Sequence, residues 1–393
     1  MADEQPRTQA YACTHCDQPA TSWCSGCREG ATFVEGANST PYCSAECQKA
    51  NWDSHKSACK RLKLTKSLYH AGDILNTLWP LLRSQTRQST VDEVHVGNNK
   101  IEFWETLETT RCRDDLNPLE GFPGDKNVSR AILDVFQITD REVICSLGVL
   151  LHKLLAGVCS QIQTLELKIK NPKLVVQCHQ RNVPEGAYYD LGLVDARVLT
   201  DLRTPAFLPG DEEPATHYIF RVRLKGSGED FAIDIANAKY GHFDTVVPWD
   251  TYLGQRVSRI IRGNITPSYS ACFAPPEAHL CRIIALSEFN TFRMKHLIES
   301  WLERNHLGYG TLVSLSKPRF AEKLANLEGF AATGLRESYP DATRCANLVA
   351  KIRFSNERDG LDGLERERVA LMTENGVLQA AEDTPRAFLF GIE

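Results

Sequence analysis

Apolar residues recur at helical spacing in several long segments of the chain. Over residues 67–82 they lie on one helix face, which comprises Leu68, Ala71, Ile74, Leu75, Leu78, Trp79 and Leu82. The same period marks five further segments, at residues 131–138, 142–158, 285–305, 319–331 and 361–373. Because an amphipathic pattern of this kind is typical of a helix packed on a core, we expect all six segments to be helical.

A second period, of two residues, predicts strands in the middle of the chain. Residues 217–224 and 231–235 alternate on either side of the turn at residues 226–228, which predicts a β-hairpin. Strand-like runs also occur at residues 100–104, 165–169 and 174–177. Helical and extended segments are interspersed and no repeat is visible, so the expected fold class is α+β.

The chain before residue 60 follows neither period and is distinguished by its cysteines. Seven of the 14 cysteines lie from Cys13 to Cys59, and the others are scattered over the remaining chain. We expect a division into four parts: a disordered N-terminus at 1–12, a finger at 13–60, a helical connector and linker at 61–126, and an α+β domain at 127–393. Proline and glycine residues mark the linker at residues 117–125.

The charge and the beginning of the chain argue against several classes of protein. The 393 residues carry a formal net charge of −5, without the basic footprint of a nucleic-acid binder. The first residues lack the apolar stretch of a signal peptide, and no segment approaches the ~20 apolar residues of a membrane span. We therefore expect an intracellular protein, of the nucleus or cytoplasm, that binds neither nucleic acid nor membrane.

The clustered residues form four chelating pairs. The pairs are Cys13 and Cys16, Cys24 and Cys27, Cys43 and Cys47, and His55 and Cys59. Thiolate and imidazole are preferred zinc ligands, and eight ligands suffice for two tetrahedral sites. The spacing of His55 and Cys59 places both on one face of a helix, which Ser44 is expected to cap. The sequence thus predicts two zinc ions per chain, although spacing alone leaves open which pairs share an ion.

The same segment resembles the MYND family of zinc fingers. The resemblance rests on Tyr42-Cys43-Ser44, Cys47-Gln48, Trp52, His55 and Cys59, and on the knuckle Cys24-Ser25-Gly26-Cys27. It is confined to residues 13–59 and implies a cross-brace, in which Cys13, Cys16, Cys43 and Cys47 bind one zinc ion and Cys24, Cys27, His55 and Cys59 bind the other. The 15 residues between Cys27 and Cys43 exceed the few that are usual in the family, so we expect this insert to loop outward beside the binding surface.

The resemblance also implies a function. MYND fingers mainly bind short proline-containing peptides in an extended form, and their groove positions match Ser25, Gln48 and Trp52. An indole offers a flat apolar wall to proline, and Gln48 can bond to a peptide backbone. The alternative is that Trp52 is a core residue between the zinc sites. The expected function is that of an adaptor, whose finger grips a proline-containing segment of a partner protein.

A basic run follows the finger at residues 60–66. Such a run is either a nuclear-import patch or the solvated end of a helix, and we favour the helix end.

One alternative makes the C-terminal domain a transglutaminase-like cysteine enzyme. Cys145 at a helix start would be the nucleophile, with His217 and Asp234 on neighbouring strands. If Ser227 and Gly228 centre the hairpin turn, however, Asp234 faces Arg221 and lies beyond hydrogen-bond reach of His217. A cross-strand ion pair between Arg221 and Asp234 is then the simpler prediction.

A second alternative is an iron dioxygenase. His242 and Asp244 have the spacing of two ligands in a facial triad, and His296 or His306 would supply the third. Both candidate third ligands fall in or at the end of a predicted helix, whereas the triad requires a β-barrel. The enzymatic alternatives therefore rank behind the adaptor.

Overall fold

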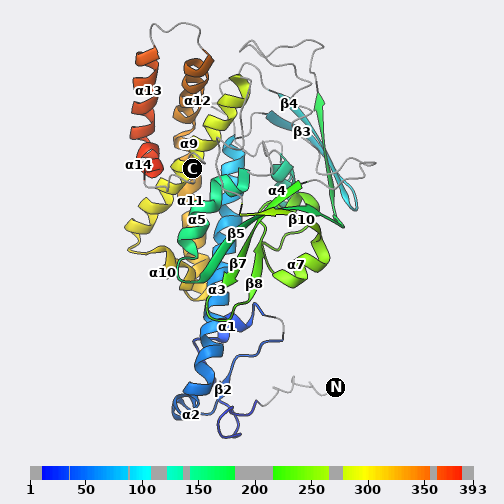
Figure 1. Ribbon diagram of the computed structural model, residues 1–393, viewed down its shortest axis with the longest axis vertical. Coiled ribbons are helices and arrows are strands. Elements are labelled where there is room, and N and C mark those ends of the chain that lie inside the picture. The colour runs from blue at the N-terminus through cyan, green and yellow to red at the C-terminus, as the bar shows by residue number, and fades with distance from the viewer. Residues whose placement is uncertain are drawn as a thin grey trace, which may run out of the picture.

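Two parts of unequal size lie along the long axis of the molecule, with the finger at one end and a larger body at the other (Figure 1). The computed structural model describes residues 11–34, 36–86, 89–107, 122–135, 142–181, 216–264, 278–354 and 361–382. A single helix, α3 (Trp52–Thr86), begins in the finger and ends in the body. The disorder expected at residues 1–12 and the linker expected at residues 117–125 fall largely outside the described residues.

Helix α3 is a central element of the body. The apolar face predicted over residues 67–82 is buried, and Pro80 lies inside the helix. In the main core it packs against α5 (Glu142–Leu154), α9 (Ala278–Arg304), α10 (Tyr309–Ser314) and α11 (Lys317–Glu337). The segment expected to connect two domains thus contributes to the main core, while the division of the chain into domains stays a prediction.

A five-stranded antiparallel sheet packs on this helical layer. Its strand order is β10-β5-β7-β8-β9, with bounds Val257–Gly263, Cys159–Ile169, Thr216–Leu224, Asp230–Ile233 and Val246–Pro248. Tyr218 and Phe220 of β7 face the helices, whereas Ile219 faces a second cluster with α7 (Trp249–Arg256) and the 3₁₀ turn η1 (Ala238–Tyr240). This alternation places successive β7 residues in different cores.

The hairpin is confirmed, but its predicted register is wrong. Arg221 lies opposite Ala232, and the backbone N–H of Leu224 donates to Glu229 O, so the turn contains four residues. Gly226 and Gly228 both adopt positive φ, at 87° and 72°, which lets the longer turn form without strain. The register therefore shifts by two residues, and Arg221 forms its ion pair with Asp230.

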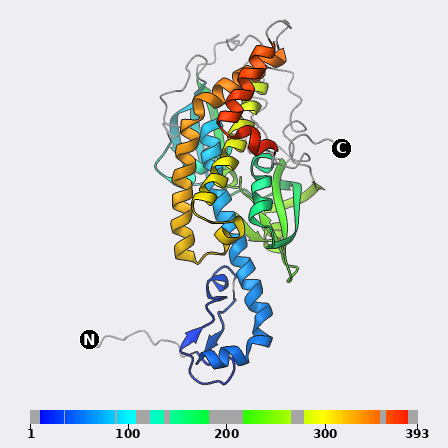
Figure 2. The same ribbon diagram turned by 90° about the vertical axis from the view of Figure 1, so that its left-hand side faces the viewer.

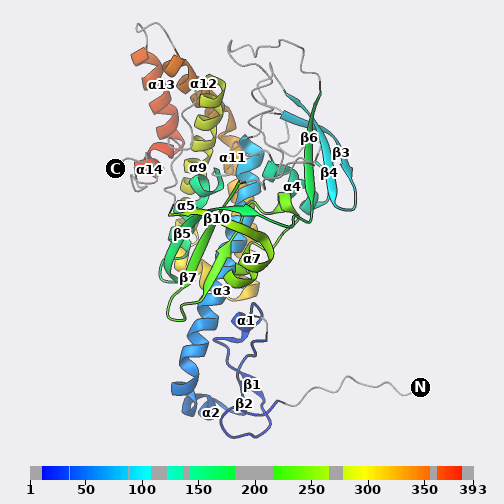
Figure 3. The ribbon, with the colours of Figure 1, turned by 45° about the vertical axis from the view of Figure 1, so that its right-hand side comes forward.

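A smaller sheet lies beside the first (Figure 3). It contains β3 (Ser89–Val96), β4 (Lys100–Leu107) and β6 (Val175–Arg181), and α4 (Lys126–Val135) packs on it. The strands expected at 100–104 and 174–177 are confirmed. Strand β3 was not predicted, because its polar residues conceal the alternation.

A further group of helices lies near the C-terminal end of the chain. Helices α12 (Tyr339–Phe354), α13 (Leu361–Glu374) and α14 (Val377–Glu382) form a separate apolar cluster with α9. The expected α+β class is confirmed, and the six predicted helical segments correspond to parts of α3, α4, α5, α9, α11 and α13. Among the described residues, no helix combines the length and the apolar character required to cross a bilayer.

Candidate metal centre and binding surface

The eight predicted ligands converge on two points in the finger. Cys13, Cys16, Cys43 and Cys47 form one cluster, which we call the outer cluster. Cys24, Cys27, His55 and Cys59 form the other, the inner cluster, and the ligand atoms of each cluster lie within 4.8 Å of one another. This is the interleaved grouping that the resemblance implies. Among the described residues, these are the two groups of three or more His, Cys, Asp or Glu side chains that converge in this way.

The spacing of the ligand atoms fits zinc. In the outer cluster, the Sγ atoms of Cys16 and Cys43 are 3.4 Å apart, those of Cys43 and Cys47 3.4 Å, and those of Cys47 and Cys16 3.7 Å. A tetrahedral zinc ion with Zn–S bonds of about 2.3 Å requires sulfur atoms about 3.8 Å apart. A site of four cysteines and a site of three cysteines and one histidine, each able to hold one zinc ion, give two zinc ions per chain.

The inner cluster is the more enclosed of the two. All four of its residues are buried, and His55 Nε2 lies 3.6 Å from Cys27 Sγ. The other ring nitrogen, Nδ1, is 3.0 Å from Thr40 Oγ1, which orients the imidazole toward the thiols. Burial lowers the pKa of His55, so the ring is neutral at pH 7 and able to bind metal. Burial also raises the pKa of Cys59 to about 12, so metal binding there must release a proton.

Short elements hold these side chains in place. Strands β1 (Ser22–Trp23) and β2 (Pro41–Tyr42) pair, and α2 (Ala45–Ala50) follows. The side chain of Ser44 accepts a hydrogen bond from Cys47 N, so Ser44 is a helix N-cap as predicted. The helix that it caps is α2, which ends before Asn51, whereas His55 and Cys59 lie on the next helix, α3. The expectation that Ser44 caps the helix of His55 and Cys59 is therefore wrong.

The long insert after Cys27 does not loop outward, and that expectation is wrong. It begins with α1 (Arg28–Ala31), which packs on α3 so closely that a Cβ at Gly30 would lie 2.0 Å from Leu62 O. Glu29 then reaches the body, where its carboxylate accepts hydrogen bonds from Lys317 N at 3.0 Å and Lys66 Nζ at 3.1 Å. Burial alone would raise the pKa of Glu29, but these two bonds hold it below its usual value.

An aromatic contact accompanies these bonds (Figure 2 shows the insert beside α3). The Phe33 ring stacks on Tyr69 with centroids 4.7 Å apart and meets the edge of His70 at 6.1 Å. His70 in turn stacks on Phe320 of α11 at 3.7 Å. We name Glu29, Phe33, Lys66, His70 and Lys317 the junction, since they connect the finger to the body.

Two of the three expected peptide-binding residues are exposed, and the third, Gln48, is half-buried. Ser25 is exposed, and the exposed fraction of Trp52 is 44%. This exposure contradicts the alternative that Trp52 is a core residue. The amide nitrogen of Gln48 lies 3.6 Å from Cys24 Sγ, and its oxygen accepts no hydrogen bond within the described part of the chain.

Comparison with known proteins identifies the finger. Residues 24–59 match the family described as "ZMYND11/ZMYD8, MYND zinc finger". The finger is a MYND zinc finger. A segment of 56 residues is also 36% identical to "Tudor domain-containing protein 1" of Oryzias latipes, and it covers 14% of this chain and 4% of that relative. No solved structure matches the chain. The family match therefore concerns residues 24–59 of the finger, and the body is described from its own geometry.

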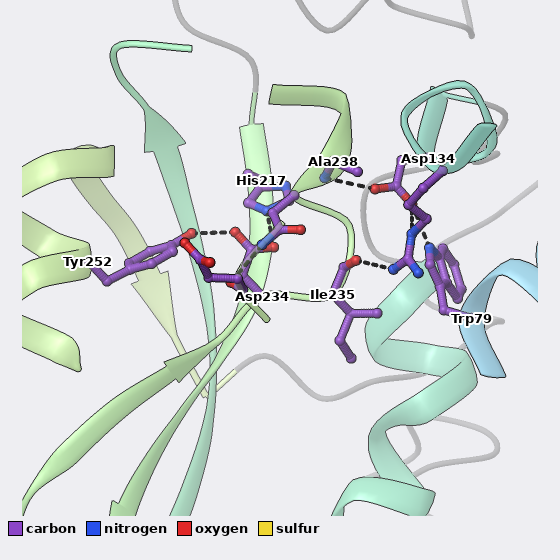
Figure 4. Close-up of polar contacts among 10 residues, drawn as sticks. Trp79, Asp134, His217, Asp234, Ile235, Ala238 and Tyr252 are labelled. Atoms are coloured by element: carbon purple, nitrogen blue, oxygen red, sulfur yellow. Dashed lines mark hydrogen bonds and ion pairs between the residues drawn. The ribbon is translucent and has the colours of Figure 1, made fainter. Parts of the chain in front are cut away.

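In the body, two of the three residues considered for a cysteine enzyme are in contact (Figure 4). His217 Nε2 lies 2.8 Å from Asp234 Oδ1, and the hydroxyl of Tyr252 donates to Asp234 Oδ2 at 2.7 Å. The four-residue turn permits this contact, so the predicted pair of Arg221 with Asp234 is wrong. Burial alone would raise the pKa of Asp234, but His217 and the bond from Tyr252 hold it below its usual value.

Cys145 does not join this pair. Its helix, α5, packs with Tyr218 and Phe220 on one face of the sheet. His217 has the opposite parity on β7, and its ring meets Tyr240 at 5.1 Å in the cluster on the other face. Because the sheet separates the thiol from the imidazole, the three side chains do not form a catalytic triad.

The residues considered for an iron site are not brought together either. His242 is buried, whereas the exposed carboxylate of Asp244 forms an ion pair with Arg256 at 3.1 Å. His296 lies on α9 against Gly376, in the C-terminal helical cluster. None of these residues belongs to a metal-binding group among the described residues.

The basic run at residues 60–66 is part of α3. Arg61 pairs with Glu229 of the body at 2.9 Å, and Lys66 belongs to the junction. Lys60 and Lys63 are exposed. The junction itself was missed from the sequence, since single residues of mixed chemistry produce no periodic signal.

Proposed function

We propose that this protein is an adaptor, in which the MYND finger grips a proline-containing segment of a partner at Ser25, Gln48 and Trp52. The observation that carries the proposal is the exposed indole of Trp52 on a finger built around two metal-binding clusters. MYND fingers are protein-interaction modules, which supports the adaptor role. Burying a large aromatic side chain is a frequent source of interface energy, so an indole left in solvent suits an anchor for a partner.

The neighbouring side chains suit an extended peptide. The amide oxygen of Gln48, which accepts no hydrogen bond from the described residues, is available to accept a backbone N–H, and Ser25 supplies a hydroxyl close by in the knuckle. Proline favours an extended chain and presents a flat ring to an indole. The body then positions the finger, and the junction fixes the direction in which the peptide meets it.

Two variants test the proposal by calorimetric titration with a synthetic proline-containing peptide. Trp52→Ala is expected to weaken binding by ~2 kcal/mol, and Gln48→Ala by ~1 kcal/mol through one lost hydrogen bond. Zinc content is measured in each sample, because the amide of Gln48 contacts a ligand of the inner site. Ser57→Ala, at an exposed position of α3, is the control and should bind like the wild type. Unchanged affinity in both variants, with two zinc ions retained, would overturn the proposal.

A further inference from the structure

The surface next to the proposed groove carries a line of positive charge. Lys56, Lys60 and Lys63 follow Trp52 along α3 at steps of four, four and three residues, and we name them the basic row. A helix turns about 100° per residue, so Trp52 and the basic row fall within about 80° of its circumference. All three lysines are exposed.

The basic row differs from the other cations of the same stretch in what it contacts. Arg61 and Lys66 are engaged by Glu229 and Glu29, with side chains 36% and 12% exposed. Within the described part of the chain, Lys60 and Lys63 form no ion pair. Lys56 pairs at 3.2 Å with Asp53, but this carboxylate is 94% exposed, and so open a pair adds little stability. The basic row is therefore available to an incoming ligand.

The basic row also contacts the knuckle that forms the other side of the proposed groove. A Cβ added to Gly26 would lie 2.7 Å from Lys63 Cε, so Lys63 touches the knuckle that contains Ser25. At 1.5 Å per helical residue, Lys56, Lys60 and Lys63 lie about 6, 12 and 16 Å along α3 from Trp52. An extended peptide advances about 3.3 Å per residue, so these lysines fall opposite positions about two to five residues from the anchored proline.

We propose that the finger selects partner segments in which acidic residues lie about two to five positions from the proline. This inference rests on the proposed function and names the chemistry of its partner: proline against Trp52, carboxylates against the basic row. Charge complementarity between exposed groups contributes modestly to affinity and more to selection and association rate. The interaction is expected to weaken with salt, because exposed charges are screened beyond about 10 Å at 0.1 M.

Three labelled peptides separate this inference from the proposed function. All share one length: the first has the core Ala-Pro-Leu-Pro with four glutamates on each side, the second replaces the glutamates by glutamines, and the third keeps the glutamates but has alanine for both prolines. Fluorescence anisotropy with the full-length, zinc-loaded protein is expected to give about fivefold tighter binding for the first than for the second at low salt. That ratio should approach one at high salt.

Variants of the protein test whether the basic row causes the preference for the glutamate peptide. Lys60→Gln combined with Lys63→Gln should bring the ratio close to one, while Lys351→Gln on the exposed surface of α12 should leave it unchanged. Lys63 lies beside Cys59 of the inner site, so zinc content is measured, and Lys60→Gln alone must lower the ratio with both zinc ions retained.

Each remaining outcome is decisive. If the glutamine peptide binds in a Trp52-dependent manner and glutamates add nothing, the acidic preference is wrong and the proposed function stands. If neither proline peptide binds, the proposed function fails. If the third peptide binds as tightly as the first, or if a single-stranded oligonucleotide displaces the first peptide at equal concentration, the row is a general anion surface and the inference is overturned.

Discussion

The finger and the body are stabilised by different means. Four of the seven buried residues in the finger cluster are cysteines, and the seven are Cys13, Cys24, Cys27, Ala31, Tyr42, Cys59 and Leu62. The main core of the body is built from aliphatic and aromatic side chains, such as Leu75, Trp79 and Trp301. An apolar core excludes water in the absence of any ligand, whereas clustered thiols stabilise a fold once metal binds them. We therefore expect the finger to depend on metal and the body not to, although α3 belongs to both.

Removing zinc should show the largest difference between the two parts. Structural zinc sites contribute ~10 kcal/mol or more to folding, so a strong chelator at neutral pH should unfold residues 13–60 and release two zinc ions per chain. Helices α9 and α11 should keep their amide protection in hydrogen exchange, because their contacts involve no ligand residue. Loss of protection throughout α9 after chelation would show that the body depends on the metal, and elemental analysis finding one zinc ion would refute the cross-brace.

The junction should couple the stability of the body to the zinc-loaded finger, with a smaller effect than the removal of zinc has on the finger. Phe33→Ala removes a half-buried ring from its stack on Tyr69 and should lower the free energy of unfolding of the zinc-loaded protein by ~1 kcal/mol. In the zinc-free protein the same substitution should have no effect on the body, because the unfolded insert no longer packs against the body. Arg28→Ala, at an exposed position of α1, is the control. Equal shifts of the melting temperature with and without zinc would contradict this coupling.

Acid should also weaken the junction. Burial lowers the pKa of His70 to about 4; Lys66, Glu29 and Lys317 are the charged groups that face it. Its pKa in the unfolded chain is about 6.5, so the unfolded state gains a proton first as pH falls. The stability that the neutral ring provides is thus complete above pH 6.5 and is lost progressively toward pH 4.

His70→Gln checks this pH dependence, since glutamine does not titrate and can still donate to Val313 O. Between about pH 7.5 and 5.5 the wild type should lose ~1 kcal/mol more than the variant, as measured by urea unfolding of zinc-loaded samples. Parallel losses in both proteins would show that His70 does not titrate across the transition.

The sequence predicts those features that depend on short-range spacing. Four chelating pairs predict the two zinc sites, and helical periodicity predicts the segments of α3 and α9 that form the core. The hairpin register depends on turn length, and the pair Gly226 and Gly228 allowed a four-residue turn that spacing alone could not distinguish. This difference decides whether His217 or Arg221 meets Asp234.

Features that depend on contacts distant in sequence could not be predicted. Glu29 accepts its hydrogen bond from Lys317, which is 288 residues away, and neither residue belongs to a periodic pattern. Strand β10 was missed because most of its residues are exposed on both faces, which removes the alternation by which a strand is recognised. The exposure of Trp52 was equally undetermined, since indoles occur both in cores and at interfaces.

In the proposed function, a zinc-bound finger captures a proline-containing partner segment. This function is tested most directly by titrating the full-length protein with the proline-containing peptide in the zinc-loaded state, after chelation, and after zinc is restored. We expect binding that disappears with the two zinc ions and returns with them, while the hydrogen-exchange protection of α9 stays constant throughout. Undiminished affinity in the zinc-free protein would place the binding site outside the MYND finger and contradict the account.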